Sequence, residues 1–201
     1  MKISKQNWKY YLFIGMGIMM LITTGIAYLP GIILNGMYEF ELTFLSNLIT
    51  GFVFITGGCI GLFQKKELPQ IYYLNSSILL VLVFLTCMAF FKEMNFSGAF
   101  LFLHIFNPIA ALIVFICFTS DGKKLKKIEL VSTFFLPIIY LVYAIAYGIL
   151  SGYWLYGFIN IDDKGILYVS IVCIIMAAGI LVVSVFLHRI SRAVYKMKAN
   201  K

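Results

Sequence analysis

Six long apolar runs follow one another along the chain, separated by short segments that hold most of the charged side chains. The runs cover residues 11–29, 42–63, 71–91, 99–118, 131–150 and 166–187. Each is close to the roughly 20 residues that a helix needs to cross the hydrocarbon core of a bilayer. The apolar residues are continuous rather than alternating, which predicts helices instead of the strands of a membrane barrel. We therefore expect an all-α polytopic membrane protein in which residues 1–201 form a single domain of six transmembrane helices.

The amino-acid composition also indicates a protein that is embedded in a lipid bilayer. Of the 201 residues, 62% are hydrophobic and only 12% are charged, whereas a water-soluble domain has about 25% charged residues. Lysines precede the first apolar run, as in a signal peptide, but no A-x-A-like cleavage site follows it. We interpret this run as an uncleaved first span.

The distribution of Lys and Arg predicts the orientation of the spans. Of the 16 basic residues, only Lys92 and Lys164 lie outside the N-terminus, the second and fourth connecting segments and the C-terminal tail. Cytoplasmic segments are enriched in Lys and Arg, so both termini are predicted to be cytoplasmic, in a cell membrane. The net charge of +8 then reflects topology and contact with anionic lipids rather than nucleic acid binding. The basic runs could also bind a regulator, although the topology rule alone accounts for them.

Cysteine usage gives no indication of a metal site. All four cysteines (Cys59, Cys87, Cys117 and Cys173) lie inside apolar runs, without the spacing of metal ligands. We interpret them as small packing residues, and we expect neither a metal ion nor a cofactor.

Two spans carry polar stripes that face the interior of the predicted bundle. Thr43, Ser46, Asn47 and Thr50 follow the spacing i, i+3, i+4 and i+7, which places them on one helical face. Gly57 and Gly61 continue that face and allow a close approach between helices. In the fourth span, His104 and Asn107 share a face with Pro108. Polar groups in lipid are costly unless they are paired, so both stripes are predicted to point inward.

The two stripes predict a site in the outer half of the bundle. Both spans run inward, and His104 lies about 9 Å from the outer end of its span at the helical rise, level with Ser46 and Asn47. Tyr143 and Tyr147 of the fifth span approach the same region. A hydroxyl and an imidazole suffice for nucleophilic acyl transfer, with Asn47, Asn107 or a tyrosine as a donor to the oxyanion. Thr43, Ser46 and Thr50 are all candidate nucleophiles, although such hydroxyls commonly bond their own helix.

The segment Phe40-Glu-Leu-Thr-Phe-Leu-Ser-Asn-Leu48 resembles the start of the second span in the androgen-induced gene family. Those proteins are six-span membrane threonine hydrolases that cleave fatty acid esters of hydroxy fatty acids. Bacterial six-span relatives are more similar still, because they pair a Thr-x-x-Ser-Asn-like segment with a His-x-x-x-Pro segment, here His104 to Pro108. The resemblance implies a bacterial membrane protein with Thr43 as nucleophile and His104 as general base.

The resemblance has one departure. Bacterial relatives often carry Tyr-Pro-Tyr-Pro-Phe-like residues before the sixth span, whereas residues 153–158 read Tyr-Trp-Leu-Tyr-Gly-Phe. The resemblance therefore does not define the structure of the outer lid over the site, or the substrate that the lid would admit.

Three functions are compatible with the sequence. The first is an intramembrane hydrolase of lipid-like acyl esters, with membrane lipids as its surroundings and Thr43 and His104 as the catalytic pair. The second is a non-catalytic carrier or lipid-binding protein, with a polar pocket between the second and fourth spans. The third is a scaffold in which the polar stripes only join helices. The absence of a carboxylate, Lys or Arg in the centre of any span argues against an ion or proton transporter.

Overall fold

The computed structural model describes residues 7–35, 41–92 and 94–200, and every regular element within these ranges is helical. Six helical segments are long and apolar enough to cross a membrane: Trp8–Gly31, Leu42–Gln64, Gln70–Ala89, Ala99–Phe118, Lys127–Ser151 and Ile166–Ala199. Each of them overlaps one of the six predicted apolar runs, which confirms an all-α polytopic membrane protein. Phe40, the first residue of the motif in the second span, lies outside the described residues.

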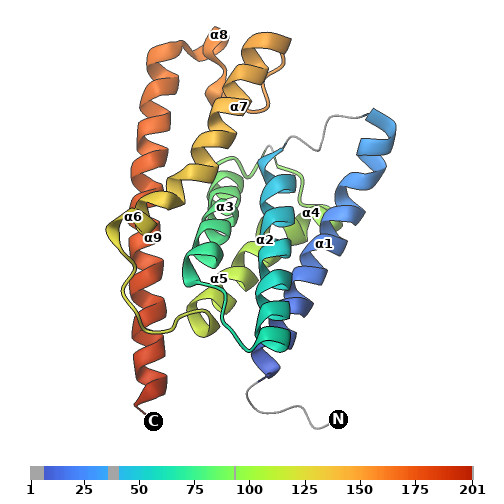
Figure 1. Ribbon diagram of the computed structural model, residues 1–201. Helices are drawn as coiled ribbons and strands as arrows, with labels where there is room; N and C mark the ends of the chain where they lie inside the picture. Colours follow the sequence, from blue (N-terminus) through green and yellow to red (C-terminus); the bar gives the residue numbers. More distant parts are fainter. Residues whose placement is uncertain (1–6, 36–40, 93, 201) are drawn as a thin grey trace.

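The helices form one bundle, and three of the spans change helical type along their length (Figure 1). The elements are α1 (Trp8–Asn35), α2 (Leu42–Cys59), η2 (Ile60–Gln64), α3 (Gln70–Ala89), α4 (Ala99–Leu101), η3 (Phe102–Phe106), α5 (Asn107–Phe118), α6 (Lys127–Val131), η4 (Ser132–Phe134), α7 (Phe135–Ser151), η5 (Gly157–Ile159), α8 (Ile161–Lys164) and α9 (Ile166–Ala199). α1 begins and α9 ends at the same end of the bundle, which we call the terminal end; the opposite end is the distal end.

Close contacts between α1, α2 and α3 form the main core. Phe13 of α1, Phe54 of α2 and Tyr73 of α3 are buried together, with ring centroids 5.3 to 5.7 Å apart. A Cβ added at Gly57 would lie 1.8 Å from the Tyr73 hydroxyl, and one at Gly61 would lie 2.1 Å from the Tyr10 ring. These two glycines therefore make room for tyrosines of the neighbouring helices within the same chain.

The fourth span is broken beside His104. Pro108 has no N–H to donate to the carbonyl four residues earlier, and its ring would clash with that carbonyl in a regular α-helix. The chain adopts the wider π-helix η3 over Phe102–Phe106 before α5 begins at Asn107. Such single π turns are one of the recognised causes of helix distortion and often occur at functional sites.

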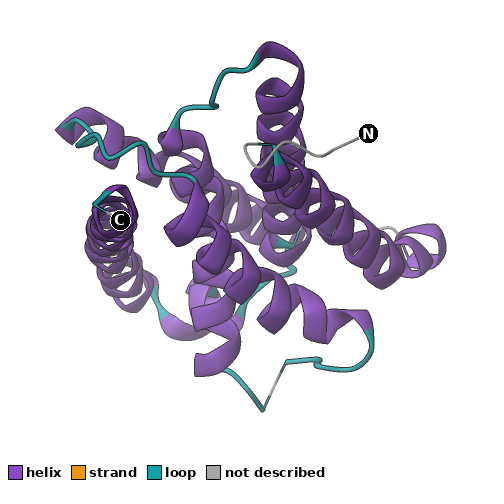
Figure 2. Ribbon diagram, turned by 90° about the horizontal axis from the view of Figure 1, so that it is seen from below, coloured by secondary structure: helices purple, strands orange, loops and turns teal. Residues whose placement is uncertain are grey.

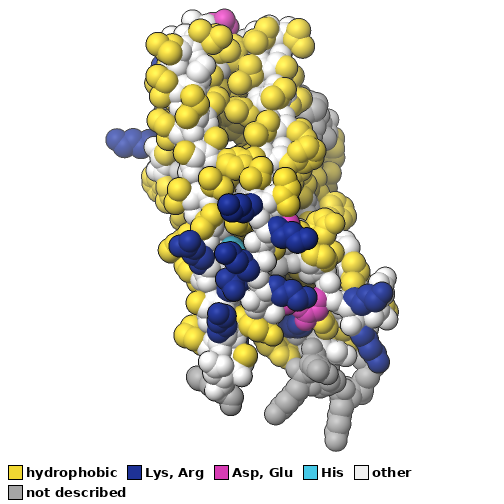
Figure 3. Space-filling view, turned by 60° about the vertical axis from the view of Figure 1, so that its left-hand side comes forward, with side chains coloured by type: hydrophobic (Ala, Val, Ile, Leu, Met, Phe, Trp, Pro, Cys, Tyr) yellow, Lys and Arg dark blue, Asp and Glu magenta, His cyan; other side chains and the backbone are white. Residues whose placement is uncertain are grey.

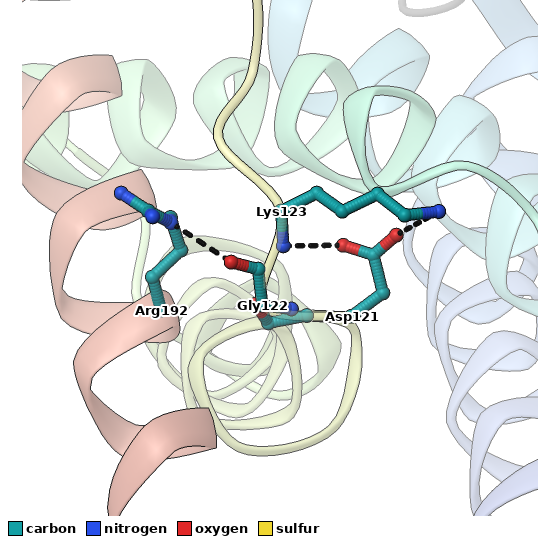
Figure 4. Close-up of polar contacts among 5 residues, drawn as sticks. Asp121, Gly122, Lys123 and Arg192 are labelled. Carbon is teal, nitrogen blue, oxygen red and sulfur yellow. Dashed lines mark hydrogen bonds and ion pairs between the residues drawn. The ribbon is translucent and has the colours of Figure 1, made fainter.

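The sixth helix extends well beyond the apolar run that predicted it, ending at Ala199 instead of residue 187. Two side chains near the end of α9 donate hydrogen bonds to the segment around the end of the fourth span. Arg192 Nε donates to the Gly122 carbonyl at 3.2 Å, and Lys198 Nζ donates to the Cys117 carbonyl at 2.9 Å. Figure 4 shows the turn, which is closed by contacts between Asp121 and Lys123 and is joined to α9 by the bond from Arg192 to Gly122. Polar contacts, rather than hydropathy, extend this helix.

Charged and apolar side chains occupy different parts of the surface. On the face shown in Figure 3, basic side chains gather over the half nearer the terminal end, while the distal half is mostly apolar. α9 lies at one edge of the bundle (Figure 2), and large side chains such as Ile174 and Val182 are two-thirds exposed. A surface of this kind suits contact with lipid.

Candidate functional site

A cavity of about 580 Å³ lies in the distal half of the bundle. Its walls come from the first turn of α2, from α3, η3, α7 and α9, and from the segment before α8. Thr43 and His104 both line it, together with apolar residues such as Leu82, Leu141 and Met176. The structure therefore brings the predicted nucleophile and the predicted base to the wall of one shared space.

The contacts of His104 fix which ring nitrogen carries the proton. Its Nδ1 lies 2.9 Å from the Asn95 backbone carbonyl, and because a carbonyl can only accept, Nδ1 carries the hydrogen. In the neutral ring, Nε2 is then the basic nitrogen. The rings of Phe96 and Phe100 pack against the imidazole, with centroids 5.7 and 5.9 Å away. His104 is thus held by its loop in the tautomer that a general base requires.

The loop that holds His104 is itself ordered by a local turn. The Asn95 side-chain oxygen accepts hydrogen bonds from the Ser97 N–H at 2.9 Å and from the Ser97 hydroxyl at 2.7 Å. Gly98 follows with φ +54 and ψ −128, a combination that is strained for any residue with a side chain. The sequence Asn-Phe-Ser-Gly therefore forms a turn that aims the Asn95 carbonyl at His104.

We expect Gly98→Ala to disturb this turn. The added methyl group meets no atom within 4 Å, so the cost comes from the backbone conformation alone and is about 1–3 kcal/mol. Thermal unfolding in detergent measures it, and Gly157→Ala, where space is also open but φ is not positive, is the control. Equal melting temperatures for the two variants would contradict the assigned turn.

Thr43 lies in the first turn of α2, where the backbone N–H groups have no carbonyl partner within the helix. One of them, the Leu42 N–H, donates to the Tyr156 hydroxyl at 3.0 Å. The Thr43 side chain interacts with the phenol of Tyr28. The nucleophile candidate thus lies beside a helix N-terminus, whose dipole favours negative charge.

Two tyrosine hydroxyls extend the polar part of the cavity wall. Tyr140 of α7 lies 3.2 Å from the Tyr156 hydroxyl, oxygen to oxygen, and both residues line the cavity. Burial raises the pKa of Tyr156 to about 12, so its hydroxyl is neutral and able to donate near pH 7. The predicted site residues Tyr143 and Tyr147 do not line the cavity, although the Tyr143 ring contacts the rings of both Tyr140 and Tyr147 in tilted pairs along α7.

Asn47 and Asn107 form a buried network behind the cavity. The Asn107 amide donates to the Asn47 side-chain oxygen at 2.8 Å and to the Thr23 hydroxyl at 3.0 Å. The Asn47 amide donates to the Thr43 carbonyl at 2.8 Å and, more weakly, to the Leu103 carbonyl at 3.4 Å. Neither amide lines the cavity. The network joins α1, α2 and the fourth span, and it holds the backbone beside Thr43 and His104.

The other two hydroxyls of the predicted stripe also bond the backbone. Ser46 donates to the Thr43 carbonyl at 3.1 Å, and Thr50 donates to the Ser76 carbonyl of α3 at 3.1 Å. Both side chains are fully buried and neither lines the cavity. Of the three candidate nucleophiles, Thr43 is the one on the cavity wall.

Glu41 lines the cavity but is not among the site residues that the sequence predicts. Its carboxylate accepts a hydrogen bond from the Tyr28 hydroxyl at 2.8 Å. Burial raises the pKa of Glu41, although the bond from Tyr28 partly opposes that shift. Its adjacency to the Thr-x-x-Ser-Asn segment is the one sequence signal that could have indicated this role.

We expect Glu41→Gln to stabilise the protein near pH 7 but not near pH 4. A raised pKa means that the folded protein binds this proton more tightly than the unfolded chain, so stability falls as pH rises through the unfolded value. Glutamine keeps an acceptor for Tyr28 and removes the buried charge. Melting temperatures in detergent across this pH range are the measurement. A difference between variant and wild type that is independent of pH would contradict the expectation.

Comparison of the chain with known protein families, with curated proteins and with solved structures finds no match. The resemblance to the androgen-induced gene family therefore stays a prediction. Among the residues that the structure describes, no group of three or more His, Cys, Asp or Glu side chains is arranged to hold a metal ion.

Proposed function

We propose that the protein is a membrane-embedded hydrolase of lipid-like acyl esters, with Thr43 as nucleophile and His104 as general base. The observation that carries the proposal is that both side chains line one largely apolar cavity, while the Asn95 carbonyl holds the proton on His104 Nδ1 and leaves Nε2 as the basic nitrogen. The excess of Lys and Arg at the terminal end supports an orientation in which the distal end, and hence the cavity, faces the outer leaflet of the cell membrane.

The reaction follows from the groups on the cavity wall. The Thr43 oxygen attacks the ester carbonyl while His104 Nε2 accepts the hydroxyl proton. Collapse of the tetrahedral intermediate breaks the bond to the alcohol, which receives that proton from His104 and leaves. A water molecule, deprotonated by His104, then attacks the acyl-threonine and releases the fatty acid and the free Thr43 hydroxyl.

Donors for the oxyanion are present beside Thr43. The first turn of α2 presents backbone N–H groups, and the hydroxyl of Tyr156, which accepts hydrogen bonds from Tyr140 and from the Leu42 N–H, lies on the same wall. Preorganised donors in a site with little water stabilise developing charge strongly. These groups replace Asn47 and Asn107 as the oxyanion donors in our proposal, because the amides of both asparagines already donate within the protein.

The direct test is acylation of the named hydroxyl. Purified protein in detergent would be given fluorogenic acyl esters of several chain lengths and, separately, a fluorophosphonate probe. We expect turnover of the esters and a probe adduct that mass spectrometry locates on Thr43. An unlabelled protein that turns over no ester of any length would refute the proposal.

One observation favours the alternative of a non-catalytic carrier or lipid-binding protein. Among the described residues, no hydrogen bond joins the Thr43 hydroxyl to the His104 ring, and Thr43 interacts with Tyr28 instead. Catalytic hydrogen bonds are often long in unliganded enzymes and shorten in the complex. The missing Thr43–His104 bond is therefore compatible with the proposed hydrolase. Stoichiometric binding of a labelled lipid without turnover or adduct would select the alternative.

A further inference from the structure

A second apolar space runs along the outside of the cavity, between α3 and α9. It has a volume of about 380 Å³. Side chains such as Val81, Leu85, Ala89, Val172, Ile175 and Val183 line it, and the few polar lining groups are those of Thr86 and Tyr168. We call this space the α3–α9 groove.

The groove adjoins the cavity of Thr43 and His104. Leu82, Thr86, Phe158, Met176 and Ile180 line both spaces, so these side chains lie at the boundary between them. Met176 is unbranched and flexible, so a change of its rotamer can open a route between the two spaces at low cost. A chain that starts in the cavity therefore has a short route into the groove.

The length of the groove suits a lipid chain. Its lining residues on α9 run from Tyr168 to Val183, which is about 22 Å at 1.5 Å per helical residue. One leaflet occupies about 15 Å of the hydrocarbon core. The groove is thus long enough for an acyl chain of one leaflet, and its walls offer such a chain the same apolar surroundings as the bilayer.

We infer that the α3–α9 groove binds the acyl chain of the ester whose carbonyl lies between Thr43 and His104. This inference rests on the proposed function and deepens it, because it assigns the acyl chain of the substrate to a site on the protein. The carbonyl and the leaving alcohol occupy the cavity with its hydroxyl groups, while the chain passes Met176 and lies between α3 and α9. Chain-length preference is then set by the residues that line the groove.

Gly179 gives a way to fill the groove without disturbing the packing. It lines the groove on α9, and a Cβ added there meets no atom within 4 Å. A phenylalanine at this position is therefore accommodated by the backbone, and its ring would occupy space assigned to the acyl chain. Gly15 of α1 is a matched control, because it too is exposed and open but does not line either space.

The first experiment compares hydrolysis of butanoyl and hexadecanoyl esters by wild type, Gly179→Phe and Gly15→Phe. We expect Gly179→Phe to lose about tenfold or more in kcat/KM for the long ester, since a filled apolar pocket rejects additional methylenes by such factors. Its activity on the short ester, and both activities of Gly15→Phe, should match wild type. Equal losses on both esters, or no loss on the long one, would overturn the inference.

The second experiment does not depend on turnover. A long-chain ester with a diazirine at the chain end would be photocrosslinked to Thr43→Ala protein, which retains the groove, and the adducts mapped by mass spectrometry. We expect adducts on groove residues such as Ile175 or Val172, and their loss when Gly179→Phe is added. Adducts confined to other helices would overturn the inference. Groove adducts in a protein that hydrolyses no ester would support the chain site and refute the proposed hydrolase.

Discussion

Thr43→Ala is expected to lower kcat for ester hydrolysis by about 10³-fold or more, because it removes the atom that forms the covalent intermediate. His104→Ala should lower it by about 10²- to 10⁴-fold, the range that positioned proton transfer contributes. The two residues act as one unit, so the double variant should be no slower than the slower single variant. Turnover of a fluorogenic long-chain ester by protein purified in detergent measures all three.

Two neighbouring hydroxyls provide controls for these variants. Ser46 and Thr50 lie on the same helix as Thr43, but they donate to the backbone carbonyls of Thr43 and Ser76 and do not line the cavity. Ser46→Ala and Thr50→Ala should therefore keep kcat within a few-fold of wild type. If Thr43→Ala retained full turnover, the nucleophile would be assigned wrongly, and loss of activity in Ser46→Ala alone would transfer the role to Ser46. Melting temperatures distinguish unfolding from loss of chemistry.

The six spans could be predicted from the sequence because the cost of exposing polar backbone in lipid leaves few alternatives to apolar helices. The ends of the spans were less predictable, since contacts between distant segments fix them. α9 continues to Ala199 because Arg192 and Lys198 bond carbonyls near the end of the fourth span. Hydropathy, which falls after residue 187, carries no information about such bonds.

In the site, too, features set within one helix were predictable from the sequence, whereas features set by packing between helices were not. Helical periodicity places Thr43, Ser46, Asn47 and Thr50 on one face, and this stripe is buried as predicted. The rotation of α7 was not encoded locally: Pro137, Tyr140 and Ala144 line the cavity, while Tyr143 and Tyr147 do not. Packing of the whole bundle decides which tyrosines reach the site.

Contacts between a loop and a helix were also beyond prediction from the sequence. The hydrogen bond from His104 goes to the backbone carbonyl of Asn95. Because every residue type has this carbonyl, the amino acid at position 95 does not predict the bond. The bond from the Leu42 N–H to Tyr156 joins residues more than a hundred positions apart. Sequence patterns identify candidate chemical groups, and the assembled bundle determines how those groups are oriented.

The largest effect on stability is expected at the crossing of α1 and α2. A Cβ at Gly17 would lie 2.5 Å from the Gly51 carbonyl oxygen and 2.6 Å from the Ile55 side chain. Because the first of these atoms belongs to the backbone, a larger residue must push the two helices apart. Gly17→Leu is therefore expected to destabilise the protein by about 3 kcal/mol or more, beyond the usual cost of overpacking a core.

Helix propensity alone predicts the opposite result, which makes this variant informative. Replacing glycine by leucine inside a helix favours the helix by roughly 1 kcal/mol, and Gly15→Leu, two residues away in open space, should show that gain. Melting temperatures of the two variants in detergent, measured against wild type, should therefore shift in opposite directions. Similar melting temperatures would show that α1 and α2 do not cross at these glycines. Separation of the helices would also move Thr23 away from Asn107, so ester turnover should fall in Gly17→Leu although no cavity residue is changed.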